Sequence, residues 1–269
     1  MKRYLLEIKT NKNIGDERWL RHLLTEWCEE LDEALRPERF GLGEPVRRRF
    51  ADQGVELAVR LSVDSGISLM LARVSKPKFL VDIDWRRDKG LDPRIFPWSC
   101  TVWLHFSAGD ERALKLLRFL IRHFEPVFGF VSTEEDHRDK HFIVFDDIGG
   151  TAEMYVGQDV EETLPGVYWV TFFGPWAVEE IGKKRFAELK AEKLESIDGG
   201  YLVQAYESGS EAGSPLAKQA ETRIINQLGK EHFFDKASVD IEALKTSPEE
   251  EVLVEEKIRE SKAKKREAK

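Results

Sequence analysis

The chain contains 269 residues, of which 41% are hydrophobic and 34% are charged, and its formal net charge is −8. This composition is typical of a globular protein with a heavily charged surface, and the negative charge argues against nucleic-acid binding over a broad surface. No apolar run approaches the roughly 20 residues that span a bilayer. The apolar residues Tyr4–Leu6 are also too few for a signal peptide. We therefore expect a cytoplasmic protein that binds no membrane.

The first half of the chain predicts one amphipathic helix followed by strands. Residues Asp16–Arg36 carry Trp and Leu at steps of three and four, with Asp16 as the N-cap. Strands are predicted at Val55–Val63, Ile67–Val74, Phe79–Trp85 and Ser99–Phe106. The sequence VDSGI at Val63–Ile67 predicts a hairpin turn, so the first two strands are expected to be antiparallel neighbours. Cys28 and Cys100 are expected to be free thiols, with one disulfide as the alternative.

The second half of the chain predicts helices and strands in alternation. A helix with a clear apolar stripe covers Asp110–Phe124. The other predicted elements are a polar loop at Ser132–Lys140, strands at His141–Phe145, Val167–Phe173 and Tyr201–Tyr206, and helices at Trp176–Leu194 and Leu216–Leu228. Runs of strands with interspersed helices predict an α+β fold with a mixed, largely antiparallel sheet and helices packed on one side. Whether it contains two similar strand–helix–strand halves is left open.

Two levels of organisation are expected from these elements. Residues 1–247 should form a single α+β domain of the immunity type. Residues 248–269 change in character to acids followed by bases with few apolar positions, which predicts a charged helical or disordered tail.

The most apolar segment is Leu164–Gly182, which reads LPGVYWVTFFGPWAVEEIG and predicts a turn, a buried strand and a helix start. Three further segments accompany it, namely LRPERFGLGEP at Leu35–Pro45, DPRIFPWSCTVWL at Asp92–Leu104, and Lys140–Phe145 with Gly149-Gly150 behind it. Together these blocks resemble the immunity protein 52 family of polymorphic toxin systems, including type VI secretion. The resemblance implies no enzymatic activity and a cognate toxin, encoded by an adjacent gene, as the partner. It also implies that this toxin is a nuclease of the restriction-endonuclease type.

The residues that we expect to contact such a toxin are acidic. They are Glu134, Glu135, Asp136, Asp146 and Asp147, which precede and follow one predicted strand. Clustered carboxylates would complement the basic site with which a nuclease binds phosphates. A solvated loop and a turn with Asx caps explain the same residues without any partner. The expected function is therefore stoichiometric occlusion of the toxin's active site, with no catalytic residue, cofactor or metal.

Two other classes of function are kept as alternatives. Asp82 and Asp84, or the pair Asp146-Asp147, would have to hold a metal in a hydrolase or nuclease. His137 and His141 have the spacing of metal ligands on a helix, but the segment between them is predicted as a loop. An adaptor that acts through its charged tail is the third class. The five tryptophans Trp85, Trp98, Trp103, Trp169 and Trp176 are expected in the core, although Trp98 would also suit an interface.

Overall fold

The computed structural model describes residues 3–66, 68–85, 98–147, 150–157, 159–160 and 162–245. Residues 92–97 of the segment Asp92–Leu104, Gly149 and the predicted tail at 248–269 lie outside these ranges. The chain divides into two compact units. Unit 1 contains Met1–Lys140 and Gly157–Phe234, and unit 2 contains His141–Val156 and Asp235–Lys269. The single domain expected over residues 1–247 stays a prediction.

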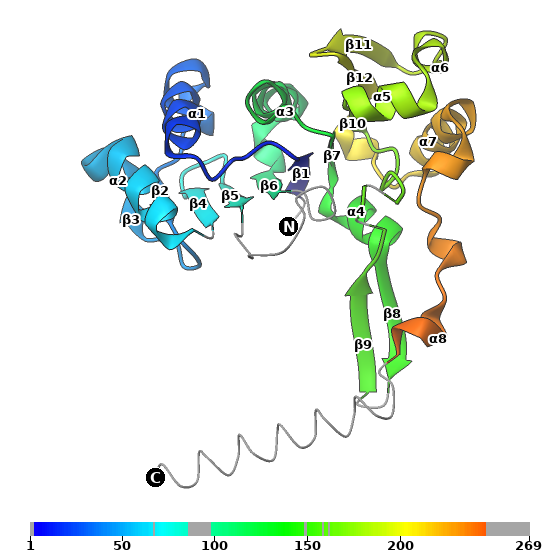
Figure 1. The fold of residues 1–269 in the computed structure, drawn as a ribbon, viewed down its shortest axis with the longest axis horizontal. Helices are drawn as coiled ribbons and strands as arrows, with labels where there is room; N and C mark the ends of the chain where they lie inside the picture. The colour runs from blue at the N-terminus through cyan, green and yellow to red at the C-terminus, as the bar shows by residue number, and fades with distance from the viewer. Residues whose placement is uncertain are drawn as a thin grey trace, which may run out of the picture. The chain divides into compact units, whose positions relative to one another are not determined.

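Unit 1 is built on a ten-stranded sheet with the order β11-β12-β10-β7-β1-β6-β5-β4-β2-β3 (Figure 1). Its strands are β1 (Arg3–Thr10), β2 (Arg39–Gly41), β3 (Arg48–Arg49), β4 (Ser68–Arg73), β5 (Phe79–Asp84), β6 (Trp98–His105), β7 (Phe128–Thr133), β10 (Val170–Phe173), β11 (Lys193–Ile197) and β12 (Gly200–Gln204). All the pairings between these strands are antiparallel. This sheet, together with the helices, confirms the predicted α+β class.

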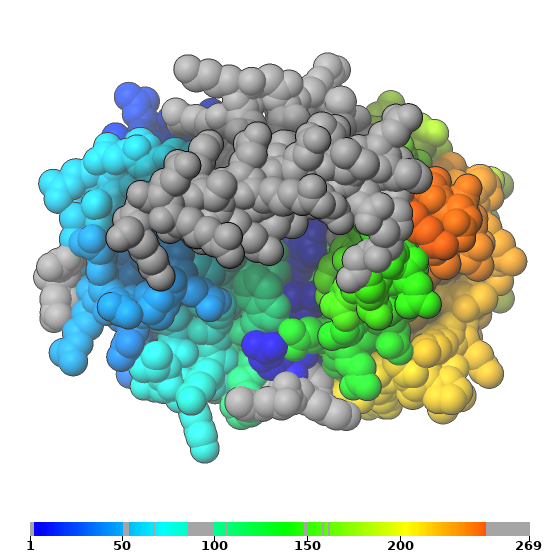
Figure 2. All heavy atoms as spheres, turned by 90° about the horizontal axis from the view of Figure 1, so that it is seen from below, coloured from blue at the N-terminus to red at the C-terminus, as the bar shows by residue number. Residues whose placement is uncertain are grey.

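The helices are α1 (Glu17–Glu30), α2 (Phe50–Ser65), α3 (Asp110–Phe124), α4 (Glu134–His141), α5 (Pro175–Ile181), α6 (Lys183–Ala187), α7 (Pro215–Leu228) and, in unit 2, α8 (Ile241–Leu244). In unit 1, α1, α3 and α5 lie along one face of the sheet (Figure 1). The side chain of Arg3 points to the opposite face of the sheet from the β1 side chains that pack on α3. It pairs with Glu134, so the start of α4 lies on that other face. Seen from below in Figure 2, the cyan residues of β4 and the yellow residues between β12 and α7 lie at opposite ends of unit 1, as the strand order requires.

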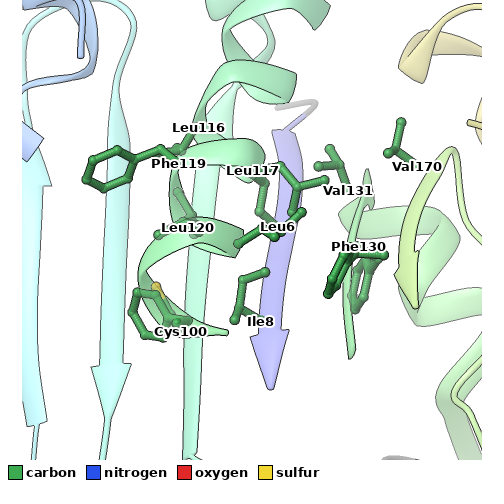
Figure 3. Packing of buried hydrophobic residues seen from close by; sticks show 14 of the residues in the cluster. Leu6, Ile8, Cys100, Leu116, Leu117, Phe119, Leu120, Phe130, Val131 and Val170 are labelled. Atoms are coloured by element: carbon green, nitrogen blue, oxygen red, sulfur yellow. The ribbon is translucent and has the colours of Figure 1, made fainter. Parts of the chain in front are cut away.

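The core of unit 1 lies between the central strands and α3. Leu6 and Ile8 of β1 lie beneath Leu117 and Leu120 of α3, and all four side chains are fully buried (Figure 3). The predicted stripe over Asp110–Phe124 is therefore confirmed as the face of α3 that packs on the sheet. Burial of each such side chain stabilises the fold by about 1.5–3 kcal/mol relative to exposure.

Several predicted elements are confirmed in type. The helix predicted at Asp16–Arg36 starts as expected but ends at Glu30, because the backbone of Leu31 is extended, and Glu33–Leu35 form a separate 3-10 turn. The Asp16 carboxylate accepts hydrogen bonds from the backbone N–H groups of Arg18 and Trp19, as an N-cap should. The strands predicted at Ile67–Val74, Phe79–Trp85 and Ser99–Phe106 correspond to β4, β5 and β6. Both cysteines are free thiols, and burial raises the pKa of each.

The strand predicted at Val55–Val63 is wrong, because this segment belongs to the helix α2. Its buried residues Ala58, Val59 and Ser62 have helical spacing. Gly66, which was assigned to a hairpin turn, has φ +66° and forms the left-handed C-cap that ends the helix.

Two further predictions need correction. The polar loop expected at Ser132–Lys140 consists of the end of β7 and the helix α4. The single helix expected at Trp176–Leu194 is broken at Gly182, whose φ of +103° suits glycine, and Leu194 already belongs to β11.

Unit 2 contains the hairpin of β8 (Phe142–Asp147) and β9 (Gly150–Tyr155), together with the short helix α8. The rings of Phe142 and Tyr155 meet edge to face, with centroids 5.1 Å apart. The Lys236 ammonium donates a hydrogen bond to the Phe142 carbonyl, which ties residues 235–245 to the hairpin.

Candidate functional site

The most apolar segment of the sequence places one of its tryptophans at the surface of unit 1. Strand β10 ends at Phe173, and the N–H of Gly174 donates to the Val127 carbonyl over 3.1 Å. A Cβ at Gly174 would lie 2.4 Å from the Pro126 carbonyl oxygen, so only glycine fits there. Pro175 then opens α5, which buries Ala177, Val178 and Ile181. Trp176 is left on the outer side of this helix and is 43% exposed.

The expectation that the tryptophans lie in the core is therefore met unevenly. Trp85 and Trp169 are buried, as predicted, with 1% and 0% exposure. Trp176 was wrongly assigned to the core. The sequence signal for its exposure is helical spacing, because Trp176 lies three and four residues before Glu179 and Glu180 and so shares the polar face of the helix.

A hollow of about 640 Å³ has Trp176 in its lining. Its lining is largely apolar and comprises Pro126, Val127, Phe172, Pro175 and Trp176, with Arg122, Glu125 and Asp198 at its charged positions. The turn Asp198-Gly199 has φ of +48° and +79°, the sign that a two-residue hairpin turn requires. The Arg122 guanidinium is already paired with Glu30 over 2.6 Å.

A second, smaller hollow of about 210 Å³ also has Trp176 in its lining and is acidic. It is lined by Glu162, Glu180, Glu231, Thr163, Leu164, Trp176, Ala177, Ile181 and His232. A short bridge between Leu164 and Phe233 brings these segments together, since the Leu164 N–H donates to the His232 carbonyl over 2.8 Å. Glu231 pairs with Arg185 at 3.6 Å. The pKa of Glu231 is lowered by the hydrogen bond from its own N–H and by the cations beside it.

We call these two hollows, together with Trp176, the Trp176 surface. Across its lining, five carboxylates (Glu125, Glu162, Glu180, Asp198 and Glu231) accompany one guanidinium, that of Arg122. Within the part of the chain that the structure describes, the side chains of Glu162 and Glu180 form no ion pair. The surface therefore combines an exposed aromatic group with a negative charge that is only partly compensated.

The acidic residues predicted as toxin contacts occupy different surroundings. Glu134 forms a two-bond pair with Arg3, at 2.9 and 3.0 Å, and Glu135 is exposed at the start of α4. Asp136 is only 1% exposed, so its carboxylate is not at the surface. Asp146 and Asp147 end β8 in unit 2, where Asp146 is exposed. Apart from Asp136, whose burial argues against a contact, these residues stay predictions.

Asp136 belongs to a polar cluster inside unit 1. The Lys140 ammonium donates to Asp136 Oδ2 over 2.6 Å and lies 3.0 Å from Glu221 Oε2. It also donates to the Val167 carbonyl over 3.0 Å and lies 4.5 Å from the centroid of the Tyr168 ring. The Ser132 hydroxyl donates a hydrogen bond to Asp136, and the Tyr206 hydroxyl donates one to Glu221. Burial raises the pKa of Glu221 to about 7 despite the cation beside it. We call this set the Lys140 cluster.

The residues considered as metal ligands each have a different role. The His137 ring stacks on Phe130 with centroids 5.3 Å apart, and burial lowers its pKa to about 4. His141 Nδ1 lies 2.8 Å from the Val156 carbonyl oxygen. Asp82 and Asp84 pair in register with Thr101 and Ser99 on the sheet. Among the described residues, no three His, Cys, Asp or Glu side chains converge as metal ligands.

Comparison with known proteins shows a likeness of fold. No model of a protein family matches the chain, and no curated protein matches it. Among solved structures, the Pseudomonas aeruginosa T6SS protein PA0821 is similar, with a TM-score of 0.50 and 14% sequence identity. The match covers 93% of this chain and 82% of that one. At this identity the likeness shows a shared fold, and membership of the immunity protein 52 family stays a prediction. None of the helices in the described ranges is long and apolar enough to cross a bilayer.

Proposed function

We propose that this protein is an immunity protein of a type VI secretion system, which neutralises a cognate effector by binding to it and not by catalysis. The observation that carries this proposal is the Trp176 surface. Tryptophan is among the residues that contribute most binding energy at protein interfaces, especially where hollows beside it receive side chains of the partner. The shared fold with a protein described as a T6SS protein supports the secretion-system context.

The frame around Trp176 suits tight binding because it is held in place before any partner arrives. Phe172 and Phe173 of β10 are 1% and 0% exposed, and Gly174 is hydrogen-bonded to the neighbouring loop. Ordering flexible side chains and loops on association costs about 0.5–1.5 kcal/mol for each side chain immobilised. Because the backbone that carries Trp176 is already held by these contacts, binding avoids the cost of ordering a loop there. Inhibition would follow from occlusion of the effector's active site.

Co-expression with the product of the adjacent gene tests the proposal. We expect the two proteins to co-purify at one-to-one stoichiometry and the growth defect caused by the neighbouring product to be relieved. The Trp176→Ala variant should weaken binding by about 30-fold, equivalent to about 2 kcal/mol.

Leu216→Ala serves as the matched control, because Leu216 is another apolar side chain of unit 1 and is 76% exposed. Its substitution should leave the affinity within a factor of about 2, since it lies outside the Trp176 surface. If no product of a neighbouring gene is bound or neutralised, the proposed function is wrong. Equal losses for both variants would instead remove Trp176 from the interface.

A further inference from the structure

We infer that the Trp176 surface receives a basic side chain and an apolar side chain from one segment of its protein partner. The basic side chain, an arginine or a lysine, would enter the smaller hollow, and the apolar one would cover the larger hollow. This inference rests on the proposed function for the presence of a partner. It adds the chemistry by which the partner is recognised.

Size and charge together define the occupant of the smaller hollow. Its volume of about 210 Å³ is below the range of about 300–1,000 Å³ that is common for small-molecule sites. It thus suits a single side chain better than a cofactor. Glu162, Glu180 and Glu231 are among its lining residues, and within the described ranges Glu231 alone of these three is paired with Arg185. A partner cation would therefore meet two carboxylates that have no ion pair within the described ranges.

The indole ring strengthens this preference for a cation. Trp176 contributes to the lining of both hollows and is 43% exposed, so we expect a side chain that enters the smaller one to contact it. A guanidinium or ammonium over the face of a tryptophan gains about 0.5–1 kcal/mol at exposed sites and more where water is excluded. Arginine is the better candidate, because its planar group stacks on aromatic rings and bonds carboxylates with two N–H groups.

The larger hollow selects a different neighbour. Pro126, Val127, Phe172 and Pro175 form its apolar lining, while its one guanidinium is already engaged by Glu30. An aliphatic or aromatic side chain would bury apolar area there at about 25 cal/mol per Å². Since Trp176 contributes to the lining of both hollows, a short segment with both side chains can fill them together. Charge then supplies the orientation, and apolar area supplies much of the binding energy.

Chemical-shift titration of the Trp176 indole N–H, assigned with Trp176→Phe, tests the cation preference without any effector. The probes are N-acetyl-arginine methylamide and its uncharged isostere, N-acetyl-citrulline methylamide. We expect a saturable shift with arginine only. The double variant Glu162→Gln/Glu180→Gln should weaken arginine binding at least about threefold, as expected for the loss of exposed ion pairs. Glu179→Gln, on the same helix but outside both hollows, should leave it unchanged.

Three results would overturn the inference. They are the absence of a saturable shift with arginine, an equal affinity for citrulline, and an equal loss in Glu179→Gln and the double variant. Because neither probe involves an effector, such a result leaves the test by co-purification and rescue unaffected. Conversely, arginine binding without rescue would support the chemistry of the hollow and contradict the proposed function.

Discussion

Replacement of the buried Glu221 by glutamine should make unit 1 more stable at neutral pH. The side chain is 4% exposed, and burial raises the pKa from its ordinary value of 4.5 to about 7. Between these two values the folded state binds more protons at this site than the unfolded state does, so the free energy of unfolding falls as the pH rises. The rise of the Glu221 pKa from 4.5 to about 7 lowers the free energy of unfolding by about 3 kcal/mol in total. Glutamine keeps the shape but cannot ionise, so the variant should not show this loss.

Urea denaturation at several pH values from 4.5 to 8 measures this effect. Tryptophan fluorescence reports on unit 1, because all seven tryptophans belong to it. We expect the stability of Glu221→Gln minus that of the wild type to increase by about 3 kcal/mol from the lowest to the highest pH. The control Glu192→Gln, at an exposed glutamate, should change the free energy of unfolding by less than about 0.5 kcal/mol. A difference that is flat or falls with pH would refute the reasoning, since the attraction of Lys140 would then outweigh the cost of burial.

Three further substitutions test other parts of the fold by the same denaturation measurement. Lys140→Met should lower the free energy of unfolding by about 3–5 kcal/mol, because it leaves two carboxylates buried without their cation. Adding Asp136→Asn and Glu221→Gln neutralises both carboxylates and should recover most of this loss. The absence of any recovery would contradict the ion-pair explanation. Gly174→Ala should cost about 1–3 kcal/mol, because its Cβ would overlap a carbonyl oxygen of the neighbouring loop, and a neutral effect would show that the loop moves freely. Asp16→Ala should cost about 1 kcal/mol through loss of the N-cap of α1, whereas Asp16→Asn should retain most of the stability.

The fold class was predictable because the longest elements carry unambiguous patterns. Helix α3 was predicted with its observed bounds, since its stripe recurs over four turns and acidic residues start it. Strand β5 was predicted from its strict alternation, which places Val81 and Ile83 in the core and Asp82 on the other face. In both elements the local pattern and the tertiary packing favour the same structure.

Prediction failed where a short pattern fits two structures. The segment Val55–Val63 alternates as a strand does, yet it also places Ala58, Val59 and Ser62 on one helical face. The residues at the start of α4 contain two features that are typical of a helix. The Thr133 hydroxyl accepts from the Asp136 N–H, which is one half of a capping box, and Asp136 and Lys140 form an i,i+4 pair. That helix explains why Asp136 is turned inward instead of lying on a solvated loop.

The candidate site was only partly predictable, because exposure depends on which elements cover a residue. Acidic character drew attention to residues 134–136 and 146–147, while Trp176 was assigned to the core with the apolar residues around it. Its hollows are built by segments distant in sequence, at residues 122–127, 162–164, 198 and 231–232. No local pattern places these segments beside one another. The charge of the smaller hollow likewise arises only after folding.

The Lys140 cluster and the Trp176 surface are connected to opposite ends of β10, so the effects of substitutions in each can be separated. Before the strand, Lys140 donates to the Val167 carbonyl. After it, Gly174 is bonded to Val127 and fixes the direction of α5, which carries Trp176. Glu221→Gln acts on the first end and should change stability without changing affinity for the partner. Gly174→Ala acts on the second end and should change both, because the added Cβ displaces the start of α5. If both variants altered affinity equally, the Lys140 cluster would have to influence the Trp176 surface through the strand between them.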